Sequence, residues 1–205
     1  MFGPKVLEEF NSPYSGNIRL IQTWGYKYVA TAGLTQSGGL VRDVWKPILK
    51  KLAHNHKLKP TSWLILGLAT GSVADMIAHK FHPQKIVGVE LDPIMLDLGR
   101  RHFGLDQIPN LHVIQADAKS YVHRSRTSFD VILVDLYLGD RLPDFVYSDP
   151  FISRLKKLGQ TIVINHLFYD DSKKLTAEGL VKKLDQVFSH IELVRTLTNL
   201  MIIAS

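Results

Sequence analysis

An apolar run passes directly into a glycine-rich turn in the stretch that decides the fold, WLILGLATGS at residues 63–72. Small residues at Gly67, Ala69 and Gly71 let the backbone turn sharply, and a helix beginning near Ser72 would point free N–H groups outward. The spacing is G-x-A-x-G, which differs from the dinucleotide fingerprint G-x-G-x-x-G. The stretch therefore predicts a strand, a tight turn and a helix, where either a ligand or packing alone explains the small residues.

Apolar, β-branched runs repeat along the chain after this point, with segments of helical periodicity between them. The expected strands are 63–67, 85–91, 111–117, 129–136 and 160–167, and the expected helices are 72–81, 93–103 and 171–188. Strands that are apolar throughout are buried on both faces, so the sheet should be parallel with helices on each side. The alternation predicts an open, doubly wound α/β domain.

The two ends of the chain depart from this alternation. Residues 190–197 and 199–205 are strand-like and are joined by only Thr198-Asn199, which is too short for a crossover helix. We therefore expect a mostly parallel, seven-stranded sheet that ends in an antiparallel C-terminal hairpin.

The first sixty residues predict a smaller unit of different structure. Residues 18–24 and 26–32 alternate around a glycine and predict a β-hairpin, and a helix is expected from about residue 40 to residue 54. We therefore divide the chain into a small N-terminal unit, 1–60, and an α/β domain, 61–205.

Acidic side chains stand at the ends of three expected strands. Glu90 follows Gly71 by 19 residues, the distance at which a ribose-binding acid follows a glycine-rich turn. Asp117 either accepts the exocyclic amine of adenine or caps the next helix. Asp135 is a base, an amine-binding group or a buried structural acid. Because the carboxyl ends of parallel strands meet at one edge of a sheet, these acids and the glycine-rich turn should share one site.

The composition excludes several kinds of chemistry. The 205 residues include no Cys, which rules out disulfides, thiolate nucleophiles and cysteine-based metal sites, and the His spacing predicts no metal site. The net charge of +6 suits an anionic or nucleic-acid partner without requiring one, and no RNA-recognition motif accompanies it. The longest apolar stretch is far shorter than the ~20 residues that cross a bilayer. We expect a soluble, cytoplasmic protein without a membrane partner.

These motifs resemble the class I S-adenosylmethionine-dependent methyltransferase fold, and within it the spermidine-synthase-like branch, over roughly residues 12–205. LILGLATGS is similar to the first motif of that fold, VGVELDP to the next, and QADA to the adenine-binding motif. The segment that starts FDVILVDL is similar to the synthase segment with its gate loop. The resemblance implies S-adenosylmethionine, or its decarboxylated form, as cofactor, bound by Gly67, Ala69, Gly71, Glu90, Leu91, Asp117 and Ala118. It also implies Asp135 as the catalytic residue, with Gln36 and Tyr137 as candidate substrate-binding residues.

The chain departs from the aminopropyltransferases of this family at the diamine subsite. Leu138 stands where they carry an Asp, Thr70 replaces an acidic residue, and residues 41–46 lack their Tyr-His-Glu cluster. A diamine needs anionic groups facing both ammoniums, because an unpaired buried cation is costly. We therefore expect a transferase that methylates an unidentified small molecule. Aminopropyl transfer and a non-catalytic module are the alternatives, and a homodimer is left open.

Overall fold

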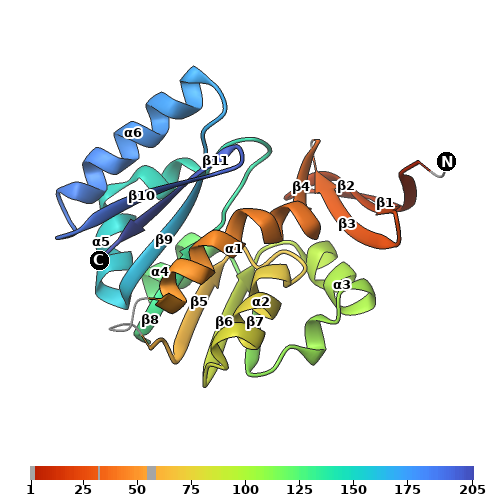
Figure 1. Ribbon diagram of the computed structural model, residues 1–205, viewed down its shortest axis with the longest axis horizontal. Coiled ribbons are helices and arrows are strands. Elements are labelled where there is room, and N and C mark those ends of the chain that lie inside the picture. The colour runs from red at the N-terminus through yellow and green to blue at the C-terminus, as the bar shows by residue number, and fades with distance from the viewer. Residues whose placement is uncertain (1–2, 32, 55–58) are drawn as a thin grey trace.

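Seven strands form the large sheet of the computed structural model, which describes residues 3–31, 33–54 and 59–205 (Figure 1). Their order is β10-β11-β9-β8-β5-β6-β7, and the pairs from β9 to β7 are parallel whereas β11 is antiparallel to both neighbours. The strands are β5 (Ser62–Leu66), β6 (Lys85–Glu90), β7 (Leu111–Gln115), β8 (Phe129–Val134), β9 (Gly159–Leu167), β10 (Ile191–Thr196) and β11 (Asn199–Ala204). The expected fold class and the C-terminal hairpin are confirmed.

The turn of that hairpin lies one residue earlier than expected. Thr196 pairs with Asn199, so Asn199 belongs to β11 and the connecting residues are Leu197 and Thr198. Leu197 has a positive φ of 49°, which gives the two-residue turn its sharp reversal.

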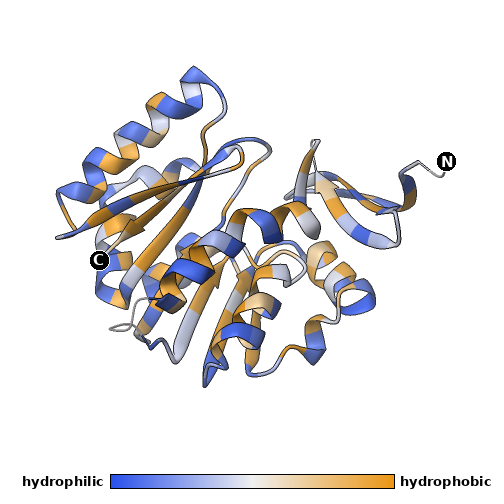
Figure 2. Cartoon of the chain, in the orientation of Figure 1, coloured by the Kyte–Doolittle hydropathy of each residue, from blue (hydrophilic) through white to orange (hydrophobic). Residues whose placement is uncertain are grey.

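Helices cover both faces of the large sheet, and α1 and α2 lie in front of it in Figure 1. They are α1 (Gly39–His54), α2 (Ser72–Phe81), α3 (Pro93–His102), α4 (Ala118–Arg124), α5 (Asp149–Leu158) and α6 (Asp171–Asp185), with short 3-10 turns η1 (Leu105–Gln107) and η2 (Asp144–Tyr147). Successive strand residues point to opposite faces. Accordingly, Leu64 and Leu66 of β5 pack with α4, α5 and α6, whereas Trp63 and Ile65 pack with α1 and α2. Figure 2 shows this apolar interior, with hydrophilic residues on the outer helix faces.

Two of these helices were given no bounds in the sequence-based expectation. Helix α4 has only seven residues, and its apolar face is short. Helix α5 follows the segment expected as a loop, 137–149, and buries Phe151, Ile152, Leu155 and Leu158. That spacing is helical, and Pro150 is favourable in the first helical turn, so the signal for α5 was present.

The N-terminal unit is a four-stranded antiparallel sheet and not a single hairpin. The expected hairpin corresponds to β2 (Gly16–Thr23) and β3 (Tyr26–Thr31), and the additional strands are β1 (Lys5–Ser12) and β4 (Leu34–Ser37). β1 is an edge strand that buries only one of its eight side chains fully, and β4 has four residues, so neither shows a clear apolar pattern.

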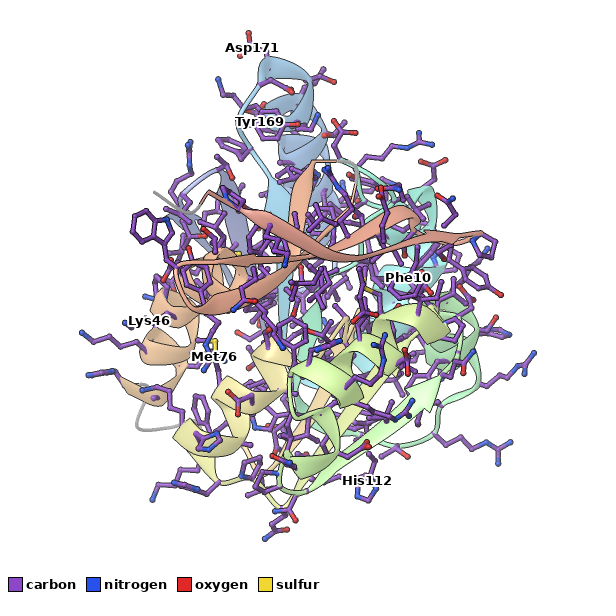
Figure 3. All side chains as sticks on the ribbon, turned by 90° about the vertical axis from the view of Figure 1, so that its right-hand side faces the viewer. Phe10, Lys46, Met76, His112, Tyr169 and Asp171 are labelled. Carbon is purple, nitrogen blue, oxygen red and sulfur yellow. The ribbon has the colours of Figure 1, made fainter. Side chains whose placement is uncertain are left out.

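The small sheet packs on the α/β domain through α3. Ile18, Leu20 and Val29 are buried against Met95 and Leu98. Figure 3 shows the small sheet crossing the molecule in front of the large one. This packing places the ends of β4 and α1 over the edge of the large sheet where β5, β6 and β8 end. In the part of the chain that the structure describes, no helix is long and apolar enough to cross a membrane.

Candidate active site

The glycine-rich turn after β5 approaches the end of β8 at van der Waals distance or closer. Gly67 has a φ of +87°, and a Cβ on it would lie 2.1 Å from the carbonyl oxygen of Asp135. The Asp135 N–H in turn donates to the Leu66 carbonyl at 2.8 Å. Ala69 also has a positive φ, 49°, which is unfavourable for a residue with a side chain. The turn is therefore held in a conformation in which Gly67 cannot be replaced without moving β8.

Glu90 fixes the other side of this turn. Its Oε2 accepts a hydrogen bond from the Ala69 N–H at 2.7 Å, and its Oε1 accepts from the N–H groups of Leu91 and Asp92 at 2.8 and 2.9 Å. Burial raises the pKa of Glu90, and these backbone hydrogen bonds oppose the increase without cancelling it. An ionised carboxylate has about four acceptor positions. Three of them are occupied within the protein, which leaves one for a ligand.

Asp117 has the capping role that was one of its two interpretations. It is the N-cap of α4, and its Oδ1 accepts from the Ser120 N–H at 2.8 Å. It also lines the cavity described below, together with Ala118 at the start of the helix. The capping bond uses one oxygen, so it does not conflict with a contact to adenine, which stays a prediction.

Asp135 is held by two neutral N–H donors from distant parts of the chain. Its Oδ2 accepts from Trp45 Nε1 on α1 at 2.8 Å, and its Oδ1 accepts from Asn165 Nδ2 on β9 at 2.9 Å. Burial raises the pKa of Asp135 to about 6, although both hydrogen bonds favour the charged form. A carboxylate with this pKa is mostly ionised at pH 7 and can still take up a proton.

A second layer of polar contacts fixes Asn165. Its Oδ1 accepts from Asn199 Nδ2 at 2.7 Å, and its main-chain oxygen accepts from the Tyr137 hydroxyl at 2.8 Å. Burial, together with the nearby Asp135 charge, raises the pKa of Tyr137 well above its usual value. Tyr137 is therefore a neutral hydrogen-bond donor at the pH values where Asp135 titrates.

Sequence reasoning missed Trp45, Asn165 and Asn199. A signal for Asn165 was available, because it interrupts the apolar strand TIVINHL much as Asp135 ends the apolar strand VILV. Trp45 is fully buried on the inner face of α1, where an aromatic residue is expected as core. Only the packing of α1 against the sheet edge brings its indole nitrogen to Asp135.

Hydroxyl groups tie the N-terminal unit to the glycine-rich turn. Ser37 Oγ bonds to Thr70 Oγ1 and, at 2.7 Å, to Ser72 Oγ, which also accepts from the Gly38 N–H at 3.1 Å. Helix α2 begins at Ser72 as expected, and its N-cap is Gly71, which makes no side-chain bond. Thr70 is fully buried in this cluster, so it faces β4 and not a substrate.

A cavity of about 820 Å³ lies over the carboxyl ends of the central strands. Most residues predicted for the site line it, namely Gln36, Gly67, Ala69, Glu90, Leu91, Asp117, Ala118, Asp135 and Tyr137. Gly71 is not among the lining residues that the structure describes. It faces inward, and a Cβ on it would lie 2.5 Å from Leu105. The structure thus gathers nine of the ten predicted residues around one cavity, and their roles there stay predictions.

Charges in the lining are mainly negative, and Lys119 is its one Lys or Arg within the described ranges. No group of three His, Asp or Glu side chains that could hold a metal ion occurs among those residues.

The comparisons with known proteins agree with this geometry. Residues 64–145 match a family model described as a methyltransferase domain. A polyamine aminopropyltransferase from Vibrio vulnificus is 30% identical over 103 residues, which are 49% of this chain and 34% of that protein. An eEF1A lysine and N-terminal methyltransferase homolog from Drosophila pseudoobscura pseudoobscura is 33% identical over 133 residues, or 59% of this chain and 20% of that protein. The chain thus spans about a third or less of the length of these curated relatives.

Solved structures share the fold at lower identity. A probable spermidine synthase from Corynebacterium glutamicum superposes with a TM-score of 0.80 and 18% identity, covering 98% of this chain and 80% of that one. Human methyltransferase-like protein 13 in complex with SAH superposes with a TM-score of 0.62 and 23% identity, covering 77% and 75%. The chain is thus similar to methyltransferase domains over residues 64–145, and it shares the fold of spermidine synthase and methyltransferase structures.

The residues of this chain fit an adenosyl cofactor. Gly67 and Ala69 line the cavity with little or no side chain, and Glu90, which also lines it, keeps one free acceptor position. Hydroxyl groups such as those of a ribose are suitable donors for such a carboxylate.

Proposed function

We propose that this chain is an S-adenosylmethionine-dependent transferase, that it methylates a small molecule, and that Asp135 is its catalytic residue. The observation that carries the proposal is the Asp135 carboxylate, held by Trp45 and Asn165 at the cavity wall with a pKa of about 6. A group so placed can position an acceptor and remove its proton near neutral pH.

The cofactor would lie against the turn and the ends of β6 and β7. Ala69, Leu91 and Ala118 would contact it, Glu90 would accept a ribose hydroxyl, and Asp117 would accept the adenine amine. When bound, S-adenosylmethionine supplies a methyl group that its positively charged sulfur has already activated. The protein therefore has mainly to align the acceptor and keep its reacting atom unprotonated.

In this proposal residues 1–60 supply one wall of the acceptor site, and residues 61–205 hold the cofactor. Gln36 lines the cavity from β4, and Tyr137 lines it from the segment after β8. Both are neutral and can hydrogen-bond to an acceptor.

Aminopropyl transfer is the second candidate, because the Vibrio vulnificus relative and the Corynebacterium glutamicum structure bear names of that activity. Two residues argue against it. Leu138 is apolar and lines the cavity, and Thr70 is buried against Ser37. Neither can offer a charge to a second ammonium.

Isothermal calorimetry tests the proposal directly. Titrations with S-adenosylmethionine, decarboxylated S-adenosylmethionine and methylthioadenosine should give the tightest binding for the first. Tighter binding of the decarboxylated form would favour aminopropyl transfer. Failure of all three to bind correctly folded protein would refute the proposal, and binding without turnover of any amine, hydroxyl or carboxyl acceptor would favour a non-catalytic module.

A further inference from the structure

The cavity extends from the ends of β6 and β7, where the proposed cofactor would lie (the cofactor half), along the same edge of the sheet toward the ends of β9 and β11. In the strand order, β6 and β7 lie on one side of β5 and β8, whereas β9 and β11 lie on the opposite side. Glu90 and Asp117 line the cavity on the first side, and Asn165 and Asn199 line it on the second. Asp135, at the end of the central strand β8, stands between the two halves.

Charge is scarce in this second half. Asp135 is partly buried and receives only neutral donors. Asp144 also lines the cavity, but it is exposed at the start of η2. Lys119, the single Lys or Arg among the described lining residues, follows β7 on the cofactor side. A partly buried carboxylate without a counter-ion is costly, so a cationic group of the ligand is the natural partner for Asp135.

Apolar side chains line much of the cavity that this carboxylate faces. Leu34 and Val44 line the cavity from the N-terminal unit, and Leu136 and Phe145 line it from the segment after β8. At the rim, three leucines from separate segments are exposed although they are large and apolar. They are Leu40 at 58%, Leu138 at 47% and Leu197 at 61%. Exposed apolar residues gathered around one opening indicate a ligand that covers them.

We propose that the acceptor is a monoamine, a single amine at the end of an aliphatic chain, and this proposal rests on the proposed function. The amine binds Asp135, and the aliphatic chain runs along the leucine rim formed by Leu40, Leu138 and Leu197. A second ammonium at the far end of such a chain would lie beside these apolar side chains, and Asp144, which also lines the cavity, is exposed, where an ion pair contributes little. The site therefore selects monoamines over diamines of equal length.

Calorimetry with protein saturated with S-adenosylhomocysteine tests this selection without requiring turnover. At pH 8, n-hexylamine should bind at least about tenfold more tightly than 1,6-diaminohexane. Along the series from butylamine to octylamine, each added CH₂ should improve affinity by up to about three- to fourfold, the value of burying a methylene. Asp135→Asn should lose most of the affinity for every amine.

A reverse variant and a matched control make the test specific. Leu138→Asp places a carboxylate on the rim and should reverse the preference, so that 1,6-diaminohexane binds more tightly than n-hexylamine. Leu175→Asp changes a leucine that is 71% exposed on α6 and does not line the cavity, and it should leave the preference unchanged.

The possible failures are distinguishable. Absence of S-adenosylhomocysteine binding would refute the proposed function, and this proposal with it. If that ligand binds and the diamine binds as tightly as the monoamine, or no amine binds, the monoamine proposal alone is overturned. An equal shift in Leu175→Asp would assign the effect of Leu138→Asp to net charge and would also overturn it.

Discussion

Asp135→Asn separates a catalytic carboxylate from a structural one, because the substitution keeps the shape of the side chain and removes its charge. In the protein, burial raises the pKa of Asp135 from 3.8 to about 6. The folded state thus binds this proton more tightly than the unfolded chain. The free energy of unfolding must therefore fall as the pH rises from about 4 through about 6.

The size of the effect follows from the two pKa values. One pKa unit corresponds to about 1.4 kcal/mol, so ionisation of Asp135 costs the folded protein about 3 kcal/mol above pH 7. About half of this cost is already present at pH 5. Between pH 5 and pH 8 the wild type should lose on the order of 1 kcal/mol relative to Asp135→Asn, which is a difference of a few degrees in Tm at this chain length.

Thermal denaturation of both proteins at pH 5, 6, 7 and 8 measures this difference, and a transfer assay at pH 8 measures function. Asp130→Asn is the matched control, since Asp130 lies on β8, the strand that Asp135 follows. Burial raises its pKa, but hydrogen bonds from Thr61 and Ser62 outweigh this and lower it, so Asp130 is ionised in both the folded and the unfolded chain from pH 5 to pH 8. Its substitution should therefore change Tm by a nearly constant amount across this range. Full transfer activity in Asp135→Asn would refute the catalytic role, and a Tm difference independent of pH would refute the assigned pKa.

Three further predictions concern the groups around Asp135. Trp45→Phe removes a donor that favours the charged carboxylate and so should raise the pKa of Asp135. In a pH–rate profile, the rise of activity should therefore occur at a pH about one unit higher. Glu90→Gln should weaken S-adenosylhomocysteine binding by about tenfold or more in calorimetry, because it removes a charged acceptor, and unchanged affinity would exclude Glu90 from the site. Gly67→Ala should lower Tm far more than Gly16→Ala, since both residues have positive φ but only Gly67 would clash with Asp135. Similar Tm values for the two glycine variants would contradict that contact.

The parallel part of the large sheet was predictable because each of its strands carries its own signal. Strands such as β8, in which residues 131–134 form an unbroken apolar run, are nearly continuous in apolar residues, and their burial on both faces follows from that pattern alone. The acids at their ends were predictable for the same reason, since the carboxyl ends of parallel strands meet at one edge. The predicted and observed strand bounds differ mainly at the strand ends. Glu90 is the last residue of β6, whereas Asp117 and Asp135 lie just beyond the ends of β7 and β8.

The additional strands of the N-terminal sheet were not predictable in this way. β1 pairs with a single neighbour and leaves all but one of its side chains exposed or half-buried, so its sequence shows no clear burial pattern. Its place in the sheet depends on tertiary contacts, including the 2.5 Å hydrogen bond from Ser12 Oγ to Asp92 Oδ2. A contact between residues so far apart in sequence has no local signature.

The same distinction separates the two halves of the cavity. The cofactor half is built from the residues that follow β5, β6 and β7, which stand close behind their strands and form recognisable motifs. The acceptor half joins Trp45 from α1, Asp135 from β8 and Asn165 from β9, which the fold alone brings into hydrogen-bond distance. Residues of the acceptor half can therefore be substituted without altering the motifs of the cofactor half. Leu138 can therefore change acceptor preference while the proposed cofactor residues stay the same, and the acceptor must be inferred from contacts rather than from motifs.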